Sequence, residues 1–194
     1  MSLKTKKRVN VNKILRVGFD LDGVLLYNPA RIARPIIVFF KKKFLPKEEK
    51  KFHLPKNKLQ KFIWWLLHKS SFKSAAGIQE IYRLVKENKI EAYIVSARYE
   101  SLKKDFENWI NKIEARKYFT GIYYNNNNEQ PHLFKEQVIK KLNIDIFVED
   151  NWDIVNHLSK NTKAKIYWIY NLLDRNIKFK NRFPNLVKAV KKLI

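Results

Sequence analysis

The chain has 194 residues, enough for one α/β domain with an inserted subdomain, and its 45% of hydrophobic residues is ordinary for a globular protein. It contains no cysteine, which excludes disulfide bridges and thiolate-bound metals. A net charge of +23, from 41 Lys and Arg against 18 Asp and Glu, would attract nucleic acid, anionic lipid or phosphorylated substrates. The chain is rich in lysine, asparagine and isoleucine together, as codon usage in an AT-rich genome would produce, so the charge alone assigns no partner.

The first segment, residues 1–13, is basic and polar, and it contains no apolar stretch that could serve as a secretory signal. We interpret it as a mobile tail that precedes the folded part of the chain. Together with the absence of cysteine, this segment predicts a cytoplasmic protein.

An apolar run that starts at Ile14 ends in two aspartates, Asp20 and Asp22, followed by Gly23. This pattern predicts a short buried strand and then a turn. Parallel sheets carry their functional groups at the carboxyl ends of strands, and glycine lets the backbone turn there and come close to a ligand. Two neighbouring carboxylates repel each other unless a cation or a shared proton offsets the repulsion. A divalent metal is the simplest such cation.

Residues 26–76 are too many for a simple connection from a strand to a helix. Two segments within them, residues 32–44 and 59–68, have helical length and apolar content. Neither apolar run approaches the roughly 20 residues needed to span a bilayer. Aromatic residues close to lysines, as at Lys41–Lys43, would suit an anionic membrane surface, although packing within the domain is the simpler interpretation.

Amphipathic periodicity predicts helices over residues 77–89 and 101–117, on either side of a strand at residues 90–95. This strand is followed by Ser96, with Arg98 two residues later. A hydroxyl and a guanidinium therefore follow the second predicted strand, just as two carboxylates follow the first.

A helical pattern starts close to Lys135, and the next apolar run, residues 144–148, ends in Glu149 and Asp150. In so lysine-rich a chain, the plainer interpretation of Lys135 is a solvated helix lysine, and nearby lysines of the same helix are alternatives to it. The remaining predicted elements are a strand at residues 121–124, a helix at 152–160, a strand at 166–170 and a helix from Pro184. Asp153 would either cap the helix at 152–160, which we prefer, or help the acidic site.

The segment Phe19–Val24 resembles the first motif of the haloacid dehalogenase (HAD) superfamily of phosphohydrolases. Ser96 is similar to the second motif, Lys135 to the third, and Glu149 with Asp150 to the fourth. Each match is modest by itself, but their order, spacing and position at strand ends agree, which makes coincidence improbable.

For the fold, this resemblance implies an α/β, Rossmann-like core with a mostly parallel, doubly wound sheet. Residues 14–25 and 77–194 would form the core, and residues 26–76 would form a small helical cap that covers the active site and selects the substrate. The cap position and the paired acids are loosely similar to those of the deoxyribonucleotidase and phosphoglycolate phosphatase groups.

For the chemistry, the resemblance implies that Asp20 attacks phosphorus and forms an aspartyl-phosphate, while Asp22 is the general acid and base. Ser96 and Lys135 would bind the phosphoryl oxygens and compensate their charge. Arg98 would assist in substrate binding, although a surface ion pair explains it equally well.

The implied cofactor is Mg²⁺, bound by Asp20, Asp150 and the backbone carbonyl of Asp22, with Glu149 acting from outside or through water. The predicted function is hydrolysis of a small phosphorylated metabolite, with a nucleotide favoured by the basic surface and the aromatic cap. One alternative is a phosphomutase or phosphotransferase. Another is a basic protein of the same scaffold that binds nucleic acid or an anionic membrane.

Overall fold

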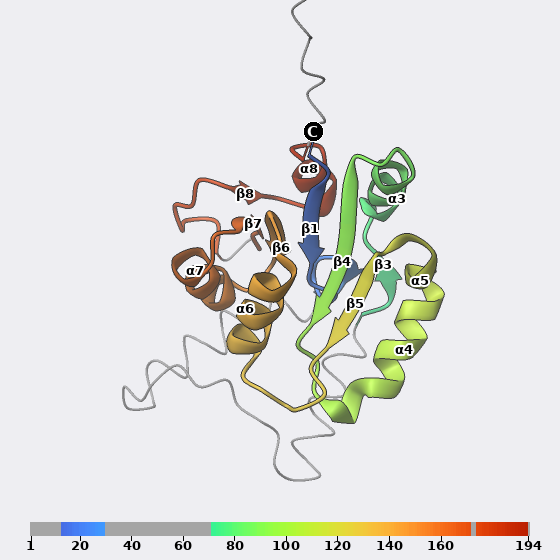
Figure 1. The fold of residues 1–194 in the computed structure, drawn as a ribbon. Coiled ribbons are helices and arrows are strands. Elements are labelled where there is room, and N and C mark those ends of the chain that lie inside the picture. The colour runs from blue at the N-terminus through green and yellow to red at the C-terminus, as the bar shows by residue number, and fades with distance from the viewer. Residues whose placement is uncertain (1–12, 30–70, 172–173, 194) are drawn as a thin grey trace, which may run out of the picture.

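The computed structural model describes residues 13–29, 71–171 and 174–193 (Figure 1). The strands are β1 (Leu15–Phe19), β2 (Leu26–Tyr27), β3 (Lys73–Ser74), β4 (Ile90–Ser96), β5 (Gly121–Tyr124), β6 (Ile146–Glu149), β7 (Lys165–Ile169) and β8 (Arg182–Phe183). The helices are α3 (Ile78–Lys86), α4 (Lys103–Lys112), α5 (Ala115–Tyr118), α6 (Pro131–Leu142), α7 (Trp152–Asn161) and α8 (Leu186–Val190), with a short 3-10 helix, η2 (Glu100–Leu102), before α4. Apart from one divided helix, the predicted elements that fall within these described ranges are found within a few residues of their expected ends.

Six strands form one sheet in the order β5-β4-β1-β6-β7-β8, and every neighbouring pair is parallel. The chain passes from β1 outward to β4 and β5, then crosses to the other side of β1 for β6, β7 and β8. The strand order therefore reverses between β1 and β6, the place where open α/β sheets bind ligands beyond the carboxyl ends of their strands. Helices cover both faces of the sheet (Figure 1), which confirms the predicted doubly wound, Rossmann-like α/β fold.

Successive residues of the central strands face two different hydrophobic cores. Val17 and Phe19 of β1 are fully buried in the core that includes α3, α4 and α8. Phe147 of β6 points the other way, into the core built with α6 and α7. This period of two explains why the strands read as nearly continuous apolar runs in the sequence, since both of their faces are covered.

Gly18 makes room for an aromatic ring next to the candidate site. A Cβ atom at Gly18 would lie 2.6 Å from Cδ2 of Phe147, its partner across the β1–β6 pair. The ring that fills this space has its centroid 6.0 Å from Nζ of Lys135. The glycine that precedes the two aspartates therefore helps to shape the wall beside the lysine of the site.

The prediction of a single helix over residues 101–117 is wrong, because the structure divides it. Between α4 and α5, Glu114 adopts a left-handed conformation with a φ of 48°. Tyr82 of α3 donates a hydrogen bond to the carbonyl of Ile113, and its ring stacks on Tyr118 with the centroids 4.0 Å apart. These tertiary contacts compensate for an uncommon backbone conformation that the apolar periodicity does not reveal.

The residue that caps α7 is Asn151, and the prediction of Asp153 is wrong. The side-chain oxygen of Asn151 accepts hydrogen bonds from the backbone N–H groups of Asp153, at 3.0 Å, and Ile154, at 3.5 Å. Asp153 lies in the first turn, where a negative charge still complements the helix dipole. The cap fixes the direction of the chain immediately after Asp150.

Two predicted segments lie largely outside the described residues: the basic tail up to residue 12, and the helical cap over residues 30–70. The described ends of the insertion form an antiparallel ribbon of β2 and β3, and Leu26 is buried in the core around β1. Across the ranges that the structure describes, no helix combines the length and the apolar character that a membrane span requires.

Candidate active site

The site is built where the carboxyl ends of β1 and β6 lie side by side. The backbone N–H of Asp20 donates to the carbonyl of Val148 at 3.0 Å, so hydrogen bonding between the two strands continues up to the first aspartate. This pairing brings Asp20 next to Glu149 and Asp150, which are far from it in the sequence. Parallel pairing of two apolar strands that each end in acids is thus enough to concentrate negative charge at one point.

Asp20, Glu149 and Asp150 form an acidic cluster, in which one carboxylate oxygen from each lies within 4.8 Å of the others. Nζ of Lys135, on α6, is 2.9 Å from Oδ1 of Asp20 and 2.6 Å from Oε2 of Glu149. Only 2% of the Lys135 side chain is exposed. The alternative interpretation of Lys135 as a solvated helix lysine is therefore wrong, because its ammonium group is buried against two acids of the cluster.

Glu149 supports this cluster from within the protein. Its side chain is fully buried, and one oxygen, Oε2, accepts from Lys135. The other, Oε1, accepts from the backbone N–H groups of Asp150, at 3.0 Å, and Asn151, at 2.9 Å. Both oxygens therefore have donors, and the side chain fixes the lysine and the start of the loop that follows β6.

Burial and neighbouring charges shift the pKa values within the acidic cluster. Burial raises the pKa of the Asp20 carboxyl well above its ordinary value; Lys135 opposes this shift, and the nearby carboxylates reinforce it. Burial likewise raises the pKa of Glu149 against the effect of Lys135. Burial alone would lower the pKa of Lys135, but Asp20 and Glu149 raise it, so the amine stays protonated. Lys135 therefore forms ion pairs with two of the three acids of the cluster, Asp20 and Glu149.

These residues fit a divalent cation of the hard type. Carboxylate and carbonyl oxygens are the ligands that Mg²⁺ prefers in proteins, and the cluster offers carboxylate oxygens that converge on one point. Asp20, Glu149 and Asp150 are the residues that could contribute to such a site. The described part of the chain brings no other group of three His, Asp or Glu side chains together in this way.

Asp22 belongs to a second cluster, beside the first. Its Oδ2 accepts from Nε of Arg98 and its Oδ1 accepts from Nη2, both at 2.7 Å, so the guanidinium binds the carboxylate with two parallel hydrogen bonds. The remaining nitrogen, Nη1, donates to Oδ2 of Asp105 on α4, again at 2.7 Å. Only 1% of the Arg98 side chain is exposed, so the alternative interpretation of Arg98 as part of a surface ion pair is wrong, because its guanidinium is buried.

Ser96 is the last residue of β4, and its hydroxyl is buried at the same edge of the sheet. The Oγ atom accepts the backbone N–H of Arg98 at 3.4 Å. Sequence reasoning missed Ser71, whose hydroxyl donates to Oδ1 of Asp22 at 3.2 Å, and it missed Asp105. Neither residue lies beside a motif, so no local signal could have found them.

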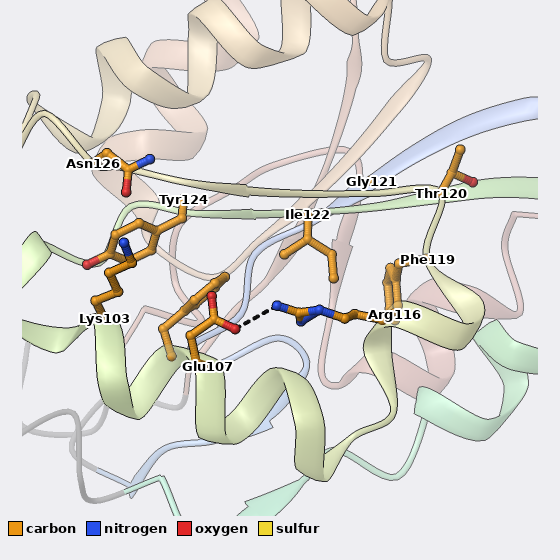
Figure 2. Close-up of a pocket in the computed structure, with 10 residues that line it drawn as sticks. Lys103, Glu107, Arg116, Phe119, Thr120, Gly121, Ile122, Tyr124 and Asn126 are labelled. Carbon is orange, nitrogen blue, oxygen red and sulfur yellow. Dashed lines mark hydrogen bonds and ion pairs between the residues drawn. The ribbon is translucent and has the colours of Figure 1, made fainter.

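A pocket elsewhere on the domain takes no part in this site. It lies along β5 and beside α4 and α5, and Lys103, Phe119 and Tyr124 are among the residues that line it (Figure 2). Arg116 and Glu107 form an ion pair at 2.7 Å across it (Figure 2). None of the candidate catalytic, phosphate-binding or metal-binding residues lines this pocket.

No family model and no curated protein matches the sequence. Solved structures do match: a haloacid dehalogenase-like hydrolase from Streptococcus pneumoniae is 15% identical, with a TM-score of 0.58 over 93% of this chain and 99% of that one. A putative β-phosphoglucomutase from Thermotoga maritima is 17% identical, with a TM-score of 0.57 over 93% and 98%. The chain has the haloacid dehalogenase fold. A variant of CbbY from Rhodobacter sphaeroides, in complex with xylulose-(1,5)-bisphosphate, is 13% identical, with a TM-score of 0.58 over 90% and 96%.

The HAD fold confirms the architecture that the four motifs imply. At these low identities the comparison concerns the fold, and the chemistry has to be argued from the residues of this chain. The structure brings four of the seven candidate residues into one cluster, Asp20, Lys135, Glu149 and Asp150. It pairs the other charged candidates, Asp22 and Arg98, with each other.

Proposed function

We propose that this protein is a Mg²⁺-dependent phosphomonoester hydrolase that acts through an aspartyl-phosphate on Asp20. The observation that carries the proposal is the buried cluster of Asp20, Lys135, Glu149 and Asp150 at the point where the strand order reverses. The similarity of the fold to HAD hydrolases and phosphomutases supports the same class of reaction.

In this proposal Asp20, Asp150 and the backbone carbonyl of Asp22 hold Mg²⁺. When bound, the metal neutralises charge on the phosphoryl oxygens and on the carboxylates around them. Glu149 acts from outside this set, because Lys135 and two backbone N–H groups already occupy its oxygens.

Each residue then has a defined part in two displacements. A carboxylate oxygen of Asp20 forms a bond to phosphorus while the ester P–O bond breaks, and Asp22 gives a proton to the departing oxygen. Water next attacks phosphorus and loses a proton to Asp22, while the bond from Asp20 to phosphorus breaks and inorganic phosphate leaves. Ser96 and Lys135 bind the phosphoryl oxygens, and Lys135 also reduces the repulsion between Asp20 and the incoming dianion.

The proposed substrate is a small phosphorylated metabolite, with a nucleotide as one candidate. The complex of CbbY with a sugar bisphosphate supports the choice of a small phosphorylated substrate. A phosphomutase is the second candidate function, favoured by the similarity to a putative β-phosphoglucomutase. The comparisons give no support to a nucleic-acid or membrane partner.

The direct test is release of inorganic phosphate from a panel of phosphomonoesters that includes p-nitrophenyl phosphate, sugar phosphates and nucleoside monophosphates. We expect turnover that requires Mg²⁺ and is lost in Asp20→Asn. The matched control is Asp145→Asn, because Asp145 pairs with Lys13 at the opposite end of β6. Turnover that survives in Asp20→Asn, or that ignores removal of Mg²⁺, would contradict the proposal, and transfer to a sugar hydroxyl would favour the phosphomutase.

A further inference from the structure

Arg98 occupies an unusual position for a candidate phosphate-binding residue. Its Nε and Nη2 atoms donate to Asp22 and its Nη1 donates to Asp105, each at 2.7 Å. Each of its three nitrogens therefore has a carboxylate partner. The planar guanidinium fork is suited to such paired contacts, and it fixes the orientation of a carboxylate as well as its charge.

Asp105 is the anchor of this arrangement. It lies in the first turn of α4, next to Phe106, which packs into the core around β1. Because Arg98 is bound by a residue of a packed helix on one side, its two other donors present a rigid fork to Asp22. The Ser71 hydroxyl adds a third donor to Asp22, at Oδ1. A guanidinium this deeply buried requires good hydrogen-bond geometry, and each of its three nitrogens donates to a carboxylate oxygen at 2.7 Å.

We propose that Arg98, anchored by Asp105, is a positioning residue that orients the Asp22 carboxylate toward the reacting oxygen, and that it does not bind the phosphoryl group of the substrate. This inference rests on the proposed phosphatase function, in which Asp22 hands a proton to the leaving group. Small displacements of a catalytic group, of about 1 Å, can lower a rate about 100-fold. The guanidinium of Arg98, which Asp105 of α4 holds in place, keeps the Asp22 carboxylate from rotating away from the reacting oxygen.

The proposal predicts that the rate depends on Arg98 to a different extent for substrates with different leaving groups. An alkyl phosphate needs a proton on its departing oxygen, so it depends on the orientation of Asp22. The p-nitrophenolate ion leaves without a proton, so p-nitrophenyl phosphate depends on that orientation far less. A general loss of structure would slow both substrates equally, and loss of a phosphate-binding contact would raise KM for both.

The experiment compares kcat and KM for p-nitrophenyl phosphate and glycerol phosphate in wild type, Asp105→Asn and Arg98→Lys. Glu107→Gln is the matched control, because Glu107 lies on the same helix and forms an exposed ion pair with Arg116 at 2.7 Å. We expect kcat for glycerol phosphate to fall about 10- to 100-fold more than kcat for p-nitrophenyl phosphate in both variants, as partial loss of general acid catalysis predicts. We expect KM to stay within about twofold, and Glu107→Gln to behave as wild type.

Equal losses on the two substrates, or a rise in KM in Arg98→Lys, would overturn the inference and leave the phosphatase proposal standing. If wild type shows no Mg²⁺-dependent turnover, or if Asp20→Asn retains turnover, both this inference and the phosphatase proposal are overturned. Thermal unfolding of each variant shows whether it is folded. If Asp105→Asn does not fold, Arg98→Lys decides the outcome alone, because it keeps the charge and loses the fork.

Discussion

Two clusters of charged side chains lie at the same edge of the sheet, one around Asp20 and the other around Asp22. The two aspartates are only two residues apart, but their carboxylates have different kinds of cationic partner. Asp20 shares Lys135 with Glu149, and Asp150 completes the cluster, so carboxylate oxygens from three side chains converge on one point. Asp22 is held by the directional fork of Arg98. The difference teaches that converging carboxylate oxygens suit a metal and a nucleophile, whereas a guanidinium with two parallel donors suits a carboxylate whose orientation matters.

The largest effect on stability should come from Lys135→Met, which removes the cation of the first cluster and keeps most of its volume. Asp20 and Glu149 would then be buried without a counter-charge, and we expect a loss of about 3–5 kcal/mol in the free energy of unfolding without Mg²⁺. The matched control is Lys140→Met, on the same helix, where the exposed pair with Glu136 contributes about 0.3–0.5 kcal/mol. Urea unfolding in EDTA measures both, and equal losses would contradict the role given to Lys135.

The next effect is a pH dependence in the stability of the metal-free protein, caused by ionisation of Asp20. Burial raises the pKa of this carboxyl in the folded state, so its contribution to stability is present below the ordinary value of 3.8 and is lost as pH rises through the raised pKa. In EDTA, Asp20→Asn should therefore be more stable than wild type near neutral pH, and the difference should shrink toward about pH 4.

Mg²⁺ should reverse the order of stability of wild type and Asp20→Asn. Adding Mg²⁺ at neutral pH should stabilise wild type and reverse its order with Asp20→Asn, because the ion binds the ionised carboxylate. Thermal unfolding across the pH range, with EDTA and with Mg²⁺, gives the comparison. A wild-type protein that is more stable than Asp20→Asn in EDTA at neutral pH would show that Lys135 fully compensates the first cluster.

The smallest effect concerns the turn that separates the two aspartates from the rest of the insertion. Gly23 has a φ of 78°, a left-handed conformation. Gly23→Ala should therefore cost about 1–2 kcal/mol, whereas Gly23→Asn should cost less because asparagine tolerates this region. Denaturant unfolding of the two variants tests this ranking, and an alanine variant as stable as wild type would show that the turn can rearrange.

Much of the fold and of the first cluster could be predicted from the sequence, for a physical reason. Apolar runs that end in polar residues mark the carboxyl ends of parallel strands, and these ends meet at one edge of the sheet. The positions of Asp20, Glu149 and Asp150 therefore follow from short local patterns. Lys135 followed from the resemblance, and the structure adds that it is buried between two acids.

The second cluster could not be predicted in the same way. Asp105 and Ser71 reach Asp22 and its partner through tertiary packing, from a helix and from the end of a long insertion. The division of the helix at Glu114 has the same origin, because contacts of Tyr82 with the following turn compensate its cost. The apolar periodicity of a segment does not predict which distant residues it will contact.

The central claim is that a divalent metal binds at the acidic cluster and does not involve the ion pair of Asp22 with Arg98. A titration with Mn²⁺ in place of Mg²⁺, followed by electron paramagnetic resonance, tests this claim most directly. The account predicts one bound ion per chain in wild type, unchanged binding in Asp105→Asn, and clearly weaker binding in Asp150→Asn. Loss of even an outer partner weakens metal binding about 10- to 100-fold, so loss of a ligand should do at least as much. A wild-type protein that binds no ion, or an Asp150→Asn variant that binds it as tightly as wild type, would contradict the account.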